Sequence, residues 1–338
     1  MPTASHLKKP LSGELMAPKI LTGLRPEAYE HPDDSAALNA LRKTKGLDFL
    51  VTKLNEWGYE RMARVQLAGS FLRVTEDNLP EIWAMLIAVR DRLAIPFTPD
   101  LYISNSEELN AFTTGVVNPV IVLTSMLVDS MEDEELVFVI AHEMGHIKSG
   151  HVLYYQMAEL IPYIGGMLGQ MTFGVGDFLM AGLQGALLHW QRTSELTADR
   201  AGLLACQNAE TAFRTLMKLA GLPHKYASRA NVEDFIAQAR LFEAMDLSIA
   251  DRVVKFLSIF GQNHPWTVMR AKELLNWIDD KGYLQVLDAP AGPCISGVEP
   301  IRRFCDRCGQ QAGAKDVFCV HCGNRLLTPE YRAMGAGN

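Results

Sequence analysis

Two histidines four residues apart constrain this chain more than any other feature. His142 and His146 lie in the segment ELVFVIAHEMGHIKSGH, and residues at this spacing share one face of a helix, so both imidazoles can reach one metal ion. Glu143, one step around the helix, could take a proton from a metal-bound water without ligating the metal. The alternative is a chance pattern in which two core histidines flank a surface glutamate.

The residues before this motif favour its interpretation as a metal site, with zinc as the metal. Asp129 or Ser130 could cap the helix, and the acidic run 132–135 lies where the helix dipole is positive. Apolar residues between 136 and 140 can bury one side of the helix. The motif is therefore expected on a capped and partly buried helix.

Zinc needs a third protein ligand, and the spacing after the motif excludes one arrangement. A metzincin places a glycine seven residues after the first histidine and a third histidine ten residues after it. Those positions hold Ser149 and Val152 here, while Gly150 and His151 each miss by one place. The metzincin arrangement therefore fails.

The segment SELTADRAG offers the other common solution, which is a glutamate on a later helix. Glu195 could ligate the ion. Asp199, four residues on along the same helix face, could accept a hydrogen bond from a ligating imidazole and fix its tautomer. A solvated acidic face is the alternative, but after a helix with two metal-binding histidines the ligand interpretation is favoured.

The segment NHPWTVMR supplies two further candidates. Peptide hydrolysis passes through a tetrahedral oxyanion that needs a hydrogen-bond donor, and His264 or Arg270 could serve. Arg270 could instead anchor Glu195 or another carboxylate. His264 could be no more than a cap of the helix that Pro265 starts.

Four cysteines near the C-terminus form a separate module. The segments CDRCG and CVHCG read as the paired knuckles of a structural zinc ribbon. Four thiolates leave no open coordination position, so this second zinc should fold the module and not catalyse. The module could be a stability device or a docking site. Its ligands would be Cys305, Cys308, Cys319 and Cys322.

The order of the expected elements predicts an α+β, mostly helical fold with a small mixed sheet. Helices are expected over 38–57 and 79–95, and the pattern from 191 to 277 is helical. DLYIS and NPVIVLTS read as strands, with NSEELNAFTTG between them as a loop or edge strand. The expected organisation is an extended or poorly ordered segment 1–35, a main domain 36–284, a linker 285–301, the ribbon 302–328 and a tail 329–338.

Residues 152–190 are apolar and rich in glycine. Their uninterrupted apolar runs fall short of the ~20 residues needed to span a bilayer. Two buried helices or a hairpin that touches a membrane surface are the simpler interpretations, and a membrane span is the alternative. Peripheral membrane contact through this segment is therefore one expectation.

Composition narrows the class of partner and the compartment. A net charge of −7 argues against nucleic acid as the main partner, because a phosphate backbone demands a basic surface. Residues 1–20 lack the apolar core of a secretory signal, and clustered cysteines suit metal binding in a reducing compartment. We therefore expect a cytoplasmic protein.

Taken in order, these motifs resemble the gluzincin peptidases of the HtpX and CaaX prenyl endopeptidase family. The resemblance spans about residues 38–280. Its segments are NAFTTG (110–115), HEMGHIKSGH (142–151), ELTADR (195–200) and HPWTVMR (264–270). The absence of a long N-terminal hydrophobic span favours the soluble branch over one that acts on prenylated or membrane-embedded substrates.

The resemblance implies a zincin-like domain and a role for each matching residue. The catalytic zinc would be bound by His142, His146 and Glu195, with Glu143 as the general base. His264 and Arg270 would lie near the transition state. A strand containing Asn110, Ala111 and Phe112 would pair with the substrate backbone, a form of β-augmentation.

Three functional hypotheses follow. The first is a zinc endopeptidase that acts on protein or peptide substrates, with a role in quality control suggested by the resemblance. The second is an adaptor that binds through the ribbon and carries an inactive peptidase domain. In the third, segment 1–35 or the apolar hairpin 160–190 occludes the cleft and keeps the enzyme latent, so deletion of 1–35 would raise activity.

Overall fold

The computed structural model describes residues 18–42, 58–116, 118–161, 175–244, 267–289, 303–304 and 311–312. Several predictions lie wholly or partly outside these residues. They are residues 43–57 of the helix expected over 38–57, the role of His264, most of the linker 285–301, the cysteine ligands of the ribbon and the tail 329–338. From the C-terminal module the structure describes only the backbone pairing of β5 (Arg303–Phe304) with β6 (Gln311–Ala312).

A mixed sheet of four strands forms one side of the fold, in the order β1–β2–β4–β3. β2 and β4 run parallel, and the two outer strands pair with them antiparallel. Every residue of β4 is buried, as its apolar run VIVL favours, whereas β3 lies at an edge of the described sheet. The strands are β1 (Leu72–Arg73), β2 (Asp100–Ser104), β3 (Ala111–Thr114) and β4 (Val120–Thr124).

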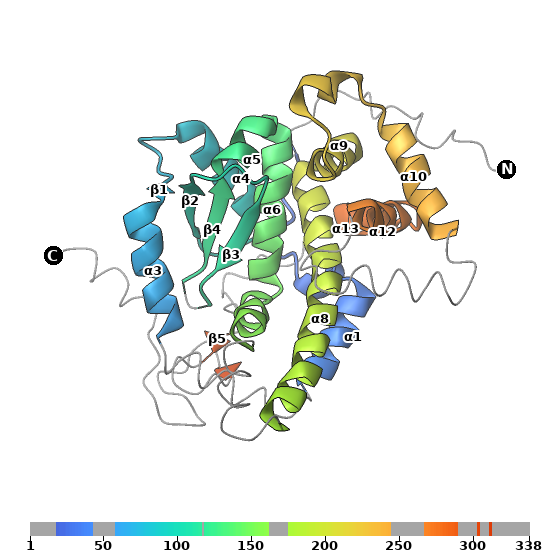
Figure 1. The fold of residues 1–338 in the computed structure, drawn as a ribbon. Coiled ribbons are helices and arrows are strands. Elements are labelled where there is room, and N and C mark those ends of the chain that lie inside the picture. The colour runs from blue at the N-terminus through green and yellow to red at the C-terminus, as the bar shows by residue number, and fades with distance from the viewer. Residues whose placement is uncertain are drawn as a thin grey trace.

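Alternation along the inner strands divides their side chains between two layers. Leu101, Ile121 and Leu123 join the main core with α4 (Pro80–Arg92) and α6 (Asp133–Lys148). Tyr102 and Val122, which point the other way, pack with Leu67 of α3 (Tyr59–Ser70). Figure 1 shows α6 running beside β3, with α3 at the opposite edge of the sheet. The prediction of a mostly helical α+β fold with a small mixed sheet is confirmed.

The N-cap of the motif helix α6 lies two or three residues later than the predicted caps. Asp129 and Ser130 belong to a short preceding helix, α5 (Ser125–Ser130). The N-cap is Glu132, whose backbone N–H donates to the Glu135 carboxylate at 2.8 Å. The prediction of Asp129 or Ser130 as the cap is therefore wrong, because α5 uses both residues before α6 starts.

The helix α8 (Val175–Cys206) crosses α6 at very short range. A methyl group placed on Gly145 of α6 would lie 2.7 Å from the Ala201 side chain and 3.2 Å from Ala198 Cα. A methyl group on Gly202 of α8 would lie 2.7 Å from the ring of Phe138. Small residues therefore set the distance between the two helices that carry the predicted metal ligands.

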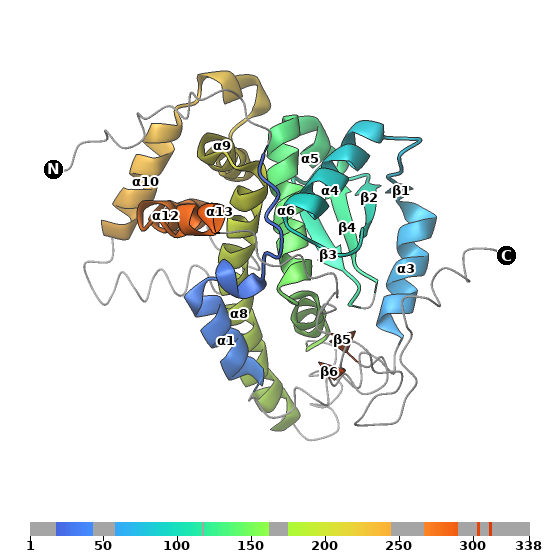
Figure 2. The ribbon, with the colours of Figure 1, turned by 180° about the vertical axis from the view of Figure 1, so that it is seen from behind.

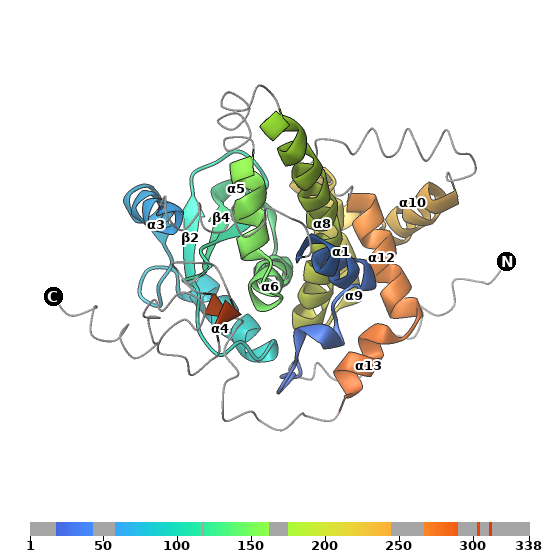
Figure 3. The ribbon, with the colours of Figure 1, turned by 90° about the horizontal axis from the view of Figure 1, so that it is seen from below.

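The apolar segment 152–190 contributes to a second buried cluster. Residues 152–161 form a helix, and α8 starts at Val175. Both pack with the N-terminal helix α1 (Pro32–Arg42), which lies against α8 in Figures 2 and 3. The cluster contains Leu38, Leu41, Leu153, Tyr154, Met157, Leu160, Ile161, Leu183, Leu187 and Trp190. Within the described residues, no helix is both long enough and apolar enough to cross a membrane.

The described N-terminal residues pack into the fold. A 3-10 turn, η1 (Pro26–Ala28), precedes α1, and the Tyr29 side chain is 1% exposed. The backbone N–H of Leu21 donates to Arg92 O at 3.0 Å. The expected extended segment 1–35 is thus replaced by regular structure over its last residues, because α1 begins at Pro32.

The remaining helices cover the other side of α8. They are α9 (Ala209–Leu219), the 3-10 helix η2 (His224–Arg229), α10 (Val232–Ala244), α12 (Thr267–Asp279) and α13 (Gly282–Asp288). In Figure 1 they stand away from the sheet, with α12 and α13 beside α8. The helix α12 begins where the sequence predicted a helix after Pro265, and it brings Arg270 against α8.

Replacement of Gly145 by alanine should destabilise the fold, because its methyl group would push α6 and α8 apart. We expect a loss of about 1–3 kcal/mol in the free energy of unfolding, measured by urea denaturation. The control is Gly182→Ala on α8, an exposed position with no atom within 4 Å of the added methyl group. That change should raise stability by about 0.5–1 kcal/mol, and equal effects at the two positions would contradict the argument.

Candidate metal centre

Three predicted ligands from α6 and α8 converge in the interior. His142 Nε2 lies 3.2 Å from His146 Nε2 and 3.4 Å from Glu195 Oε2. His146 Nε2 lies 3.4 Å from Glu195 Oε1, and all three side chains are buried. The candidate ligand atoms lie within 4.8 Å of one another, so one ion could contact all of them. Two imidazoles and a carboxylate are a donor set that suits zinc in a catalytic site.

His142 is held from behind by Asp199, which lies one turn after Glu195 on α8. His142 Nδ1 and Asp199 Oδ1 are 3.0 Å apart. A proton on Nδ1 donates to this carboxylate and leaves Nε2 free to face the other ligands. Burial alone would raise the pKa of Asp199, but the charge and hydrogen bonds of Arg270 hold it below its usual value.

Arg270 reaches the site from α12 and contacts carboxylates. Its Nε and Nη2 donate to the two oxygens of Asp199 at 2.8 Å and 2.6 Å, and its Nη1 lies 3.6 Å from Glu195 Oε2. It is 7% exposed. Of the two roles that the sequence left open, these contacts match the anchoring of carboxylates. A pocket opens beside the three candidate ligands, and the described residues that line it do not include Arg270.

The two histidines hold protons differently. Burial opposes protonation of His142, but hydrogen bonds to Asp199 and Glu195 outweigh it and raise its pKa to about 9. Burial lowers the pKa of His146. The surrounding carboxylates thus favour a positive charge at His142, and a divalent cation could take the place of that proton.

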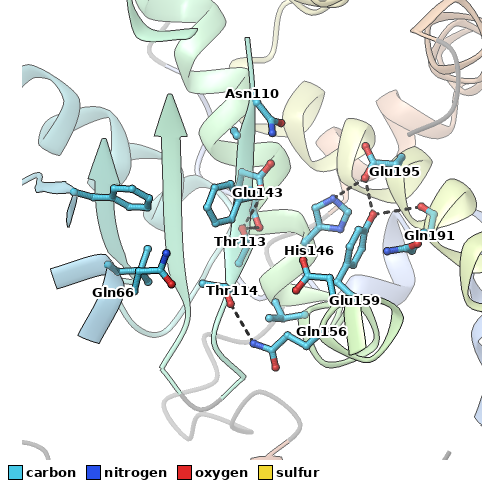
Figure 4. A pocket seen from close by; sticks show the side chains of 16 residues that line it. Gln66, Asn110, Thr113, Thr114, Glu143, His146, Gln156, Glu159, Gln191 and Glu195 are labelled. Carbon is cyan, nitrogen blue, oxygen red and sulfur yellow. Dashed lines mark hydrogen bonds and ion pairs between the residues drawn. The ribbon is translucent and has the colours of Figure 1, made fainter. Parts of the chain in front are cut away.

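A pocket of about 430 Å³ opens beside these ligands, between β3 and the helices α3 and α8. Glu143 and His146 line its floor, and Figure 4 shows the Glu143 carboxylate pointing toward β3. Thr113 Oγ1 of β3 donates to Glu143 Oε2 at 2.6 Å. Of the predicted strand, Ala111 and Phe112 belong to β3, and Asn110 lies just before it. All three line the pocket.

Sequence reasoning missed several polar residues around the ligands. Thr113 carried no motif signal of its own, although it lies in the quoted segment NAFTTG. The hydroxyl of Tyr155 donates to Glu195 Oε1 at 2.6 Å and lies 3.1 Å from Ser194 Oγ. His151, considered only as a misplaced metzincin ligand, has its Nδ1 3.0 Å from His146 Nδ1. The spacing of five residues between the two histidines gave no hint of this contact.

Comparison with known proteins agrees with the geometry. The model of peptidase family M48 matches residues 75–278. The chain is 30% identical to the chloroplastic plastoglobule-localized metallopeptidase 48 of Arabidopsis thaliana over 273 residues, 80% of this chain and 78% of that protein. It is 28% identical to a protease HtpX homologue of Persephonella marina over 194 residues, 51% of this chain and 66% of that protein. A Nostoc punctiforme HtpX homologue is 27% identical over 226 residues, 60% of this chain and 75% of that protein.

Replacement of Arg270 by methionine should be strongly destabilising if the guanidinium neutralises buried carboxylates. Its loss would leave Asp199 buried without its cation, which typically costs about 3–5 kcal/mol in the free energy of unfolding. The matched control is Arg240→Met, which removes an arginine 3.8 Å from Asp279 in a pair that is more than half exposed. That change should cost under about 1 kcal/mol in the same denaturation experiment. Similar losses in both variants would argue against the anchoring role.

Proposed function

The chain belongs to peptidase family M48, and we propose that it is a zinc-dependent endopeptidase whose metal is held by His142, His146 and Glu195. Membership of the family makes the chain a metallopeptidase that acts on peptide bonds. The observation that carries the finer proposal is the position of Glu143, which lies in one pocket with His146, Glu195 and an open strand edge. Those are the parts needed to bind an extended peptide and hydrolyse it.

The residues in and behind the pocket divide the tasks of this reaction. When bound, zinc would lower the pKa of the attacking water and polarise the peptide carbonyl. Glu143 accepts the proton of that water and delivers it to the leaving amine. Thr113 donates to one oxygen of Glu143 and so fixes the orientation of the carboxylate, with the other oxygen available for the proton. Asp199 and Arg270 hold the ligands from behind.

The edge strand β3 supplies the binding surface for substrate. Within the described part of the chain, β3 pairs through one side only, with β4, and its residues line the pocket. A peptide that adds to the open side would lie along β3, in the pocket that Glu143 also lines. Phe112 is 40% exposed and offers an apolar contact to a substrate side chain. Protein or peptide segments in extended conformation are therefore the substrate class.

We assign a second, structural zinc to Cys305, Cys308, Cys319 and Cys322, on the strength of their paired C-x-x-C spacing. Free thiols that can bind metal persist most readily in a reducing compartment, which supports the cytoplasmic location expected from the sequence. The name of the Arabidopsis relative places that protein at plastoglobules, which supports peripheral contact with a lipid surface through the apolar segment that includes residues 162–174.

Replacement of Glu143 by glutamine should lower peptidase activity by at least about 100-fold, because the amide cannot accept the proton of the attacking water. Activity would be measured on casein and on a peptide library, with zinc content determined on the same samples. Zinc should stay bound, since Glu143 is not among the proposed ligands.

The matched control is Glu134→Gln, the same substitution at an exposed position in the first turn of α6. It should leave both activity and zinc content unchanged. Cleavage by Glu143→Gln at the rate of the unmodified protein would rule out the general-base mechanism.

Metal analysis of the full chain should find two zinc ions per molecule, one at each proposed site. Cys308→Ser should reduce the count to one and preserve the Glu143-dependent cleavage, because the ribbon zinc has no open position for chemistry. Glu195→Gln should also reduce the count but abolish cleavage. A count of two in Cys308→Ser would exclude the assigned ribbon ligands.

A further inference from the structure

The second metal-binding histidine is backed by a chain of polar side chains that ends on the N-terminal helix. His146 Nδ1 lies 3.0 Å from His151 Nδ1, and His151 Nε2 lies 3.1 Å from Asp34 Oδ2 on α1. The three side chains are fully buried. We propose that Asp34 is a positioning residue that acts through His151 to hold His146 in its metal-binding tautomer. This inference rests on the proposed zinc site.

The contact between the two histidines fixes where their protons lie. A short Nδ1–Nδ1 contact requires one ring to donate and the other to accept. His146 Nε2 faces His142 and Glu195 and must be free of a proton to bind metal. The proton of His146 is therefore on Nδ1 and is donated to His151. His151 in turn carries its own proton on Nε2, toward Asp34.

Asp34 is suited to select these tautomers of His151 and His146. Its Oδ2 lies 3.1 Å from His151 Nε2, close enough for a strong electrostatic attraction between the carboxylate and a proton on that nitrogen. A carboxylate cannot donate to Nε2, so it favours the tautomer of His151 with the proton on that atom. The opposite tautomer would place two ring N–H groups against each other at the His146 contact.

The carboxylate of Asp34 is also tied to the helix that carries Glu195. Trp190 Nε1 donates to Asp34 Oδ1 at 3.0 Å, and Thr197 Oγ1 donates to Oδ2 at 2.6 Å. Both partners lie on α8, and Asp34 is 1% exposed. These bonds fix the carboxylate relative to the metal ligands. The helix α1 is thereby part of the support of the site.

This role changes the expectation for the N-terminal segment. The described residues 18–42 contribute none of the side chains that line the pocket, and they pack behind the ligands. Deletion of residues 1–35, which would relieve an occluding segment, should instead weaken metal binding because it removes Asp34. The two hypotheses about this segment therefore predict opposite results.

The test is the zinc affinity of Asp34→Asn, measured by competition with a chromogenic chelator. The indole of Trp190 can only donate, so the amide oxygen should face it and the amide NH₂ should face His151. His151 would then accept on Nε2 and donate from Nδ1, which moves the proton of His146 onto its metal-binding nitrogen. We expect the affinity for zinc to fall about 10- to 100-fold.

The matched control is Glu135→Gln, the same loss of charge in a buried ion pair, with Lys218, in the first turn of α6 and about two turns before His142. It should lower the melting temperature and leave zinc affinity unchanged. The inference is overturned if Asp34→Asn binds zinc like the unmodified protein, or if Glu135→Gln loses as much affinity.

A second pair of variants keeps the test decisive where Asp34→Asn does not fold. His151→Asn places an amide oxygen near the position of Nδ1 and can still accept from His146, so it should retain most of the affinity. His151→Phe offers no acceptor and should lose about 10- to 100-fold. Equal affinities for these two variants would also overturn the inference.

The tautomer itself can be read without metal. In metal-free protein, the ¹⁵N shifts of the His146 ring should show the proton on Nδ1, and in Asp34→Asn on Nε2. If the tautomer changes in this way but the unmodified protein binds no zinc, the proposed function is refuted and the positioning role stands. Zinc binding with an unchanged tautomer would refute the positioning role alone.

Discussion

The close crossing of α6 and α8 is the constraint on which the rest of the structure depends. Gly145 leaves no room for a side chain against Ala201, so the two helices meet almost backbone to backbone. The helix α6 carries both histidines, and α8 carries Glu195 and Asp199. The distance between the helices therefore sets the distance between the two imidazoles and the two carboxylates. A residue without a side chain thus determines the geometry of the metal centre.

The metal centre also concentrates buried negative charge. Asp34, Asp199 and Glu195 are each about 1% exposed, and Arg270 supplies a permanent positive charge beside two of them. Buried carboxylates are costly unless cations or hydrogen bonds compensate them. The Trp190, Thr197 and Tyr155 side chains supply such bonds. A divalent ion would complete the neutralisation, which makes metal binding a contribution to folding as well as to chemistry.

The parts of the site that follow helical periodicity could be predicted from the sequence, and the parts that depend on tertiary contact could not. His142 and His146, or Glu195 and Asp199, are related by one turn of a helix, and their convergence follows from that spacing. Arg270 had two open roles because only the packing of α12 against α8 selects its partner. Asp34 lies more than a hundred residues before His151 in the sequence, and no local pattern connects them. The cap of α6 was misplaced because Ser130 is a good cap residue already used by α5.

The position of β3 at the edge of the sheet has a consequence for which proteins the enzyme can attack. A strand can pair with β3 only if its own backbone N–H and C=O groups have given up their previous partners. Stably folded domains rarely expose such a stretch, whereas frayed termini and locally opened regions do. Cleavage would then follow the free energy of local opening in the target more closely than its amino-acid sequence, so that the edge strand selects substrates by their conformational state.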